Sequence, residues 1–169
     1  MKKLFICLLL IVFVATPVFG LPSFQNSPDG FRGIKWGDPP SAMGKYRLDT
    51  QDDDYIKLYS RLDDKMSLGE VPLDLLEYIF CVDRLMGITI QTKSLHFIDM
   101  KQILITQYGN PFQENKYIEK YTWVDNNAFI AFEDFSIEGI CELRIYSVPE
   151  VKLMERVQKE KAKKASGDF

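Results

Sequence analysis

Few residues in this sequence could carry out chemistry, because it has a single histidine, His96, among 169 residues. A serine or cysteine nucleophile needs a base beside it, and no serine lies in a Gly-x-Ser-x-Gly setting. A zinc site needs several histidine or cysteine ligands, and the sequence has no such cluster and no His-Glu-x-x-His pattern. We therefore interpret His96 as a surface histidine without a chemical role, and we predict no catalytic, metal-binding or cofactor-binding residue.

Paired carboxylates are the other residues in this sequence that could act in catalysis. Asp63-Asp64 and Glu133-Asp134 are adjacent acids of the kind that a glycosidase uses as general acid and general base. Adjacent residues of a strand point to opposite faces, however, and exposed acids are common on protein surfaces. A carboxylate-dependent hydrolase is therefore the alternative function, behind a domain without catalysis.

A second acidic group, Asp49 with Asp52, Asp53 and Asp54, precedes an expected strand. A calcium loop of the EF-hand type needs a glycine at its sixth position and a glutamate at its twelfth. Counted from Asp49, these positions hold Asp54 and Ser60. The calcium signature fails, and the sequence favours a solvated turn.

The beginning of the chain has the three parts of an export signal. Two lysines follow the first methionine, residues 4–15 are apolar throughout, and Val18 and Gly20 are small or compact residues at the −3 and −1 positions of a cleavage site. The apolar run is shorter than the roughly 20 residues that an uncleaved membrane anchor needs. We predict that residues 1–20 are a signal peptide and that a periplasmic or secreted protein begins at Leu21.

Cleavage would leave an acidic protein, because it removes two of the 21 basic residues and none of the 24 acidic ones, which changes the formal charge from −3 to −5. Binding to nucleic acid depends on neutralising phosphates, so nucleic acid is not an expected partner. Cleavage would also remove Cys7 and leave Cys81 and Cys141. In an oxidising compartment these two permit one disulfide, and the alternative is two buried thiols that pack as small apolar side chains.

Apolar periodicity predicts one internal helix over residues 95–108, with Ser94 as its N-cap. Its apolar side chains recur at spacings of three and four, and Gly109 and Pro111 end it. A shorter helical turn is expected after Asp38. The face of the internal helix that should be buried consists of Phe97, Met100, Leu104 and Tyr108.

The pattern of β-rich runs and turn residues predicts an α+β fold with an antiparallel sheet. Similar turns, Trp36-Gly37-Asp38-Pro39 and Tyr108-Gly109-Asn110-Pro111, suggest a helix-plus-three-strand unit used twice. We expect residues 21–30 to be a flexible lead-in, residues 31–150 to form one domain and residues 151–169 to form a basic C-terminal helix and tail. The predicted strands are residues 55–62, 77–82, 85–92, 117–124, 129–135 and 139–147.

A loop at Asn126-Asn127 sets the register of two of these strands. It places aromatic and aliphatic side chains together on the core face and an ion pair on the reverse face. The next strand should bring Cys141, Leu143 and Ile145 to the core side. The predicted opposite pairs are Trp123 with Ile130, Tyr121 with Phe132, and Lys120 with Glu133.

The C-terminal helix has basic residues around a narrow apolar stripe of Val151, Met154 and Val157. Such a helix can touch an anionic membrane surface or an acidic partner. The sequence favours a helix docked by one edge, with a frayed lysine-rich tail.

The second half of the chain carries a short pattern, in which Tyr108-Gly109-Asn110-Pro111 is followed by Tyr121-Thr122-Trp123 and an apolar strand over residues 128–133. This pattern resembles the small bacterial envelope domains of the β-lactamase-inhibitor-protein type and the barrel-assembly accessory lipoproteins. The resemblance implies a binding module without catalysis. The expected function is an exported, non-catalytic binding or structural domain of the cell envelope, whose partner is another protein or a small ligand.

Overall fold

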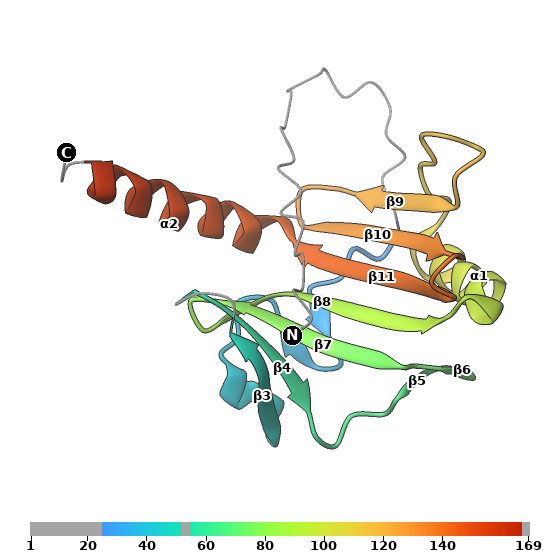
Figure 1. Cartoon of the computed structure of the whole chain (residues 1–169), viewed down its shortest axis with the longest axis horizontal. Helices are drawn as coiled ribbons and strands as arrows, with labels where there is room; N and C mark the ends of the chain where they lie inside the picture. The colour runs from blue at the N-terminus through green and yellow to red at the C-terminus, as the bar shows by residue number, and fades with distance from the viewer. Residues whose placement is uncertain (1–24, 52–54, 167–169) are drawn as a thin grey trace.

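The structure, a computed structural model, describes residues 25–51 and 55–166, apart from the side chains of residues 164 and 165. In these residues a seven-stranded antiparallel sheet and two α-helices form the fold, which confirms the predicted α+β class (Figure 1). The predicted signal peptide lies outside the described residues. The elements are β1 (Gly30–Phe31), β2 (Ile34–Lys35), η1 (Pro40–Met43), β3 (Tyr46–Gln51), β4 (Ile56–Arg61), β5 (Ser67–Leu68), β6 (Val71–Pro72), β7 (Leu75–Cys81), β8 (Arg84–Lys93), η2 (Ser94–His96), α1 (Phe97–Tyr108), β9 (Lys120–Val124), β10 (Ala128–Phe135), β11 (Ile140–Ser147) and α2 (Val148–Ser166).

The main sheet has the strand order β3-β4-β7-β8-β11-β10-β9. Strands β4, β7 and β8 pair as neighbours in one half, strands β9, β10 and β11 do so in the other, and the halves join along β8 and β11. This order agrees with the predicted repeat of three strands. The first half differs from the second in having an additional edge strand, β3, and a single 3-10 turn, η1, where the second has α1.

The two faces of the sheet are covered differently. The larger core lies between the sheet and α1, where Phe97 of the helix stacks on Phe132 of β10 with ring centroids 5.1 Å apart. The opposite face carries a smaller cluster of Ile79, Cys81 and Met86, against which Val151 and Met154 of α2 pack. Both α1 and α2 therefore bury an apolar stripe, each against a different face.

Helix α1 has the buried face that the sequence predicts, with Phe97, Met100 and Leu104 in the core. It begins after the short 3-10 turn η2, and the Ser94 hydroxyl donates to Asp134 at 2.7 Å and does not cap the helix. Gly109 ends α1 with a φ of 83°, a value that residues other than glycine rarely adopt.

The register predicted for β9 and β10 is confirmed, since Trp123 lies opposite Ile130 and Lys120 opposite Glu133. The Trp123 ring is buried and donates from Nε1 to the Gly109 carbonyl at 2.8 Å. On the reverse face Lys120 and Glu133 form an ion pair at 3.2 Å. Tyr121 pairs with Phe132 as predicted, and Cys141, Leu143 and Ile145 lie in the core.

The hairpin between β7 and β8 turns through Val82 and Asp83, which have φ angles of 51° and 56°. Positive φ at both central residues is typical of a type I′ turn, whose twist matches that of the flanking strands. Asparagine and glycine are the usual residues in such a turn. A β-branched valine with positive φ is strained. The predicted strands 77–82 and 85–92 are thus joined by a tight hairpin, with an unfavourable residue at its first turn position.

Helix α2 begins at Val148, earlier than the predicted residue 151, because Pro149 does not break the chain there but sits in the first turn. The Ser147 hydroxyl accepts from the Glu150 backbone N–H at 3.3 Å and caps the helix. Glu150 also accepts two hydrogen bonds from Arg84, at 2.7 and 2.8 Å. From this anchored start α2 extends away from the sheet (Figure 1).

Further segments differ from the sequence prediction. Edge strand β3 was not expected, nor were the short strands β1, β2, β5 and β6. The 3-10 turn η1 begins at Pro40 without a side-chain cap, while Asp38 accepts from the Lys35 backbone N–H at 2.9 Å. In the described part of the expected lead-in, Gln25 donates from its backbone N–H to the Tyr108 carbonyl at 2.9 Å, and the Asn26 side chain donates to the Gln107 carbonyl at 3.0 Å. This part of the lead-in is therefore held against the end of α1.

Candidate binding groove

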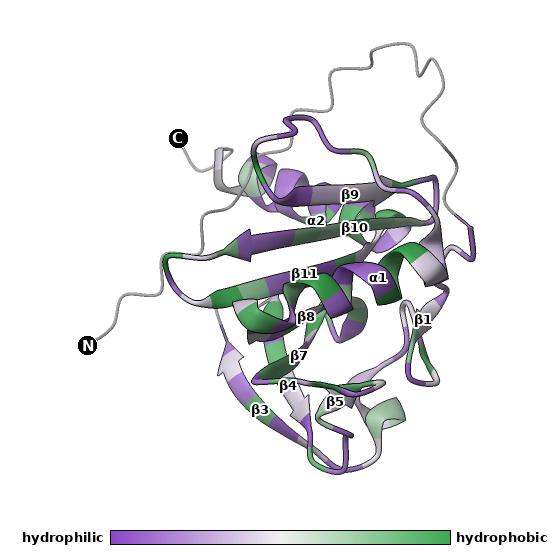
Figure 2. Cartoon of the chain, turned by 90° about the vertical axis from the view of Figure 1, so that its right-hand side faces the viewer, coloured by the Kyte–Doolittle hydropathy of each residue, from purple (hydrophilic) through white to green (hydrophobic). Residues whose placement is uncertain are grey.

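A groove of about 850 Å³ lies between α1 and the β5–β6 hairpin. In Figure 2 α1 lies in front of the sheet, with β5 below it and β1 beside it. Ligand sites in proteins commonly have volumes of about 300–1,000 Å³. The groove is lined by Phe31, Leu68, Gly69, Glu70, Val71, His96, Asp99, Gln102, Ile103, Leu104, Thr106, Gln107, Tyr108, Leu143 and Ile145.

The floor of the groove is apolar and rigidly placed. Leu143 and Ile145 belong to the central strand β11, and Val71 and Leu104 are buried beside them. Ile103 is half-buried and packs on the same core. The floor itself is only 2–4 % exposed, so an apolar segment seated here would mainly contact Ile103 and the other half-buried apolar residues of the lining.

The rim of the groove is polar and has two carboxylates, Glu70 and Asp99, which are both exposed. His96, predicted to be an exposed histidine without a role, is half-buried on the same rim. Within the residues that the structure describes, no hydrogen bond or ion pair joins the side chains of these three residues. They surround the opening without forming a coupled catalytic group.

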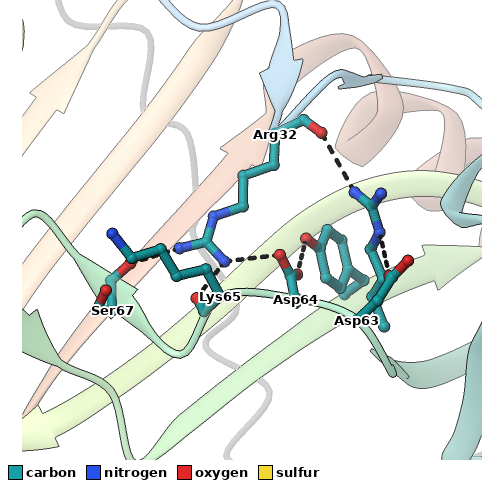
Figure 3. A network of polar contacts seen from close by, with 7 residues as sticks. Arg32, Asp63, Asp64, Lys65 and Ser67 are labelled. Carbon is teal, nitrogen blue, oxygen red and sulfur yellow. Dashed lines mark hydrogen bonds and ion pairs between the residues drawn. The ribbon is translucent and has the colours of Figure 1, made fainter.

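One arginine positions the chain that leads into the β5–β6 wall (Figure 3). Arg32 lies in the turn between β1 and β2 with a φ of 48°, and its guanidinium reaches the connection from β4 to β5. It donates to Asp64 at 2.7 Å, to the Lys65 carbonyl at 2.6 Å and to the Ser67 carbonyl at 2.7 Å. The planar fork of arginine suits such a set of oxygen acceptors.

Asp64 is also bound from the core side, where the hydroxyl of buried Tyr78 donates to its other oxygen. Burial and then the hydrogen bond to Asp64 raise the pKa of Tyr78, so the phenol stays protonated. The Asp64 side chain is only 6 % exposed and has Arg32 as its counter-charge. Buried charges are tolerated when they are paired and hydrogen-bonded in this way, and Asp64 therefore has a structural task.

The carboxylates predicted as alternative catalytic pairs point to different partners. Asp63 accepts from Arg61 at 3.0 Å, whereas Asp64 faces Arg32 and Tyr78. Glu133 pairs with Lys120 on one face of the sheet, whereas Asp134 accepts from Ser94 and Ser136. Neither pair lines the groove.

The other acidic group is divided by the limits of the described residues. Asp49 lies in β3, forms an ion pair with Arg47 at 2.8 Å and accepts from Ser60. Asp52, Asp53 and Asp54 lie outside the described residues. Glu77 on β7 has a raised pKa, caused mainly by burial and then by the charges of Asp49 and Glu142, and it too lies outside the groove.

The possible disulfide between Cys81 and Cys141 is absent, and both residues are buried as thiols. Cys81 belongs to the smaller cluster and Cys141 to the larger core, on opposite faces of the sheet. Along β8 their partners are Arg84 and Thr92, eight residues apart, which corresponds to roughly 26 Å. A disulfide requires Cα atoms within about 7 Å, so the register itself excludes the bond.

The groove could not be predicted from the sequence because its walls come from segments far apart in the chain. Arg32 and the β5–β6 hairpin belong to turn-rich stretches without periodicity. The Gly69 turn was the local signal available, since it joins two very short strands with a φ of 57°.

In the described ranges, neither α1 nor α2 has the length and apolar character needed to cross a membrane. Comparison of the chain with protein-family models, with curated proteins and with solved structures found no match. The resemblance of the second half to small envelope domains stays a prediction.

Proposed function

We propose that this protein is an exported binding domain without catalytic activity, and that it holds an apolar segment of an envelope protein in the groove beside α1. The groove carries the proposal, because its buried apolar floor is open along a polar rim. Export is proposed from the sequence, in which residues 1–20 have the pattern of a signal peptide.

The construction of the walls supports a binding role. The sheet holds the floor, α1 is packed on the core, and the Arg32 contacts hold the chain that enters β5. A site that is already in its bound shape loses less conformational entropy when a partner arrives.

The arrangement of ionisable groups supports binding over catalysis. General acid–base chemistry needs groups within hydrogen-bond reach of one another or of a shared reacting atom. In the described part of the rim, Glu70, His96 and Asp99 make no such contacts with one another. The carboxylates Asp64 and Asp134, which the sequence offered for catalysis, are engaged in structural hydrogen bonds elsewhere.

The rim also indicates the chemistry of the partner segment. Glu70 and Asp99 place negative charge beside an apolar floor. A segment with two or three large apolar side chains and a neighbouring lysine or arginine would satisfy both features. We therefore expect an apolar segment with a basic flank to bind better than the same segment with an acidic flank.

The test is a selection of peptides from a displayed random library on the chain that begins at Leu21. We expect the selected peptides to be apolar with basic flanks, and to shift the backbone NMR signals of Gln102, Thr106 and Gly69. Ile103→Glu puts a charge on the apolar wall and should weaken binding by at least about tenfold. Ile98→Glu is the matched control, because Ile98 is on the same helix, is 68 % exposed and does not line the groove.

Two outcomes would contradict the proposal. Peptides that bind Ile103→Glu as tightly as they bind the unchanged protein would place the site elsewhere. Cleavage of the selected peptides, lost in Asp99→Asn or His96→Ala, would show that the groove is an active site. Thermal unfolding of each variant separates a loss of binding from a loss of fold.

A further inference from the structure

Helix α2 carries a stripe of basic side chains, which we call the basic stripe. It consists of Lys152, Arg156, Lys159 and Lys163, which follow one another at spacings of four, three and four and are all exposed. Successive residues rotate by about 100° around a helix, so these four lie within about 60° of one another. They form a straight row roughly 16 Å long on one face of α2.

The basic stripe faces away from the contacts that dock the helix. Met154, which packs on the smaller cluster, is two positions after Lys152 and therefore lies on the other side of α2. Lys161 also belongs to that other side, where its ammonium lies over the Tyr55 ring at 4.6 Å from the centroid. Docking on the sheet thus leaves the basic stripe open to solvent.

Charge is separated between α2 and the rest of the molecule. Val148–Ser166 has six basic and three acidic residues, whereas residues 21–147 have 13 basic and 20 acidic residues. Within the part of the chain that the structure describes, the four residues of the basic stripe form no ion pair. Each pair of neighbours along the row has like charges, so contacts within the stripe do not stabilise α2.

We propose that the basic stripe binds the surface of an anionic phospholipid bilayer, with α2 lying along the headgroups and not inserting. Helix α2 extends from the rest of the molecule (Figure 1). The four cations of the basic stripe lie in a straight row on this helix, so all of them can contact a flat membrane surface at the same time. The face has no apolar side chain that could enter the acyl region, so attraction is electrostatic. Each basic residue near such a surface contributes about fivefold in affinity. The acidic sheet would be repelled, so the molecule binds through α2.

The experiment is co-sedimentation of the chain that begins at Leu21 with vesicles of phosphatidylcholine alone or with 30 % phosphatidylglycerol added. We expect binding to the anionic vesicles only, with a clear loss as salt rises and screens the charges. The variant K152Q/R156Q/K159Q/K163Q should bind at least about tenfold more weakly, while its circular dichroism stays helical because glutamine is a good helix former.

The matched control removes the same charge from residues outside α2, in the variant K35Q/K45Q/K93Q/K116Q, whose four lysines are exposed. It should still bind the anionic vesicles. Equal losses in both variants would show that only net charge matters and would overturn the proposal. Unchanged binding of the stripe variant would overturn it too, as would capture of soluble polyglutamate in place of vesicles, which would indicate an acidic protein partner. None of these results depends on the groove.

Discussion

Arg32 shows what a single side chain contributes to this structure. It supplies hydrogen bonds to one carboxylate and two backbone carbonyls that belong to another part of the chain. A lysine has a single ammonium and could not match this planar set of acceptors. The position of the β5–β6 wall therefore depends on the identity of one residue in a distant turn.

The reactivity of Cys81 and Cys141 toward a thiol reagent tests whether the two residues are thiols. In guanidinium without reductant, the chain that begins at Leu21 should show two reactive thiols per molecule, because Cys81 and Cys141 are buried as thiols. The folded protein should show almost none, and added reductant should leave its melting temperature unchanged. A thiol reagent such as Ellman's measures both states. Fewer than two thiols in the unfolded chain would contradict the structure.

Val82 offers a second prediction, because its positive φ opposes its β-branched side chain. Val82→Asn should stabilise the protein by about 1 kcal/mol, since asparagine tolerates this conformation and the Val82 side chain is 47 % exposed. Urea unfolding measures the change. The same substitution at exposed Leu62 is the control and should give no comparable gain; a destabilised Val82→Asn would show that the turn has another shape.

Among the elements, β9, β10 and β11 are those in which local sequence decides the structure. Alternation fixes which face is buried, and the short loop at Asn126-Asn127 fixes the register. The predicted pairs could be read without knowledge of the rest of the chain, because neighbouring strands meet through a tight turn.

This register predicts very different losses of stability for substitutions at two positions of β9. Trp123→Ala should lower the free energy of unfolding by roughly 3–5 kcal/mol, because the ring is 2 % exposed and would leave a cavity. Lys120→Ala should change it by no more than about 0.5 kcal/mol, because its ion pair with Glu133 is on the surface. Denaturant titration compares the two, and equal losses would contradict the pairing.

Elements outside such local patterns could not be predicted. Strand β3 is exposed on both faces, with Tyr46 and Leu48 each more than 40 % exposed, so it lacks the alternation that marks a half-buried strand. It exists because β4 offers an edge to pair with. Ser147 and Glu150 have the spacing of a capping box, which indicates a helix that begins at residue 148. The proline between them instead suggested that the helix begins after it.

The groove lies beyond what this sequence can predict for a different reason. Its residues come from α1, β11 and the β5–β6 hairpin, and the contacts that unite them join positions more than 30 residues apart, as from Arg32 to Ser67. Periodicity describes the face of one element. It does not say which second element will leave that face partly uncovered.

The molecule as a whole should lose stability in alkali. Burial raises the pKa of Cys141 from 9.0 to about 11, and burial also raises the pKa values of Tyr78, Tyr108 and Tyr146. Groups whose pKa is raised on folding contribute stability that is complete below their unfolded pKa and is lost as the pH rises through the folded value. The free energy of unfolding should therefore fall from about pH 9 upward.

Urea titrations between pH 7 and pH 11 measure this fall. Cys141→Ala removes one of the groups, so its stability curve should be flatter between pH 9 and pH 11 even though the variant starts from a lower value. Parallel curves for the two proteins would show that Cys141 does not titrate with a raised pKa.

The meeting of the two halves along β8 and β11 governs how the chain reaches its structure. Within each half, paired strands are close in sequence, whereas Ile90 and Leu143 of the central pair are more than 50 residues apart. Closing a short loop costs less entropy than closing a long one, so strand pairs within a half gain contacts early and the central pair gains them late. Folding speed is thus set by the encounter of two preformed halves. Contacts of the central pair then form in the slow step, so a change on β8 that weakens this pair should slow folding.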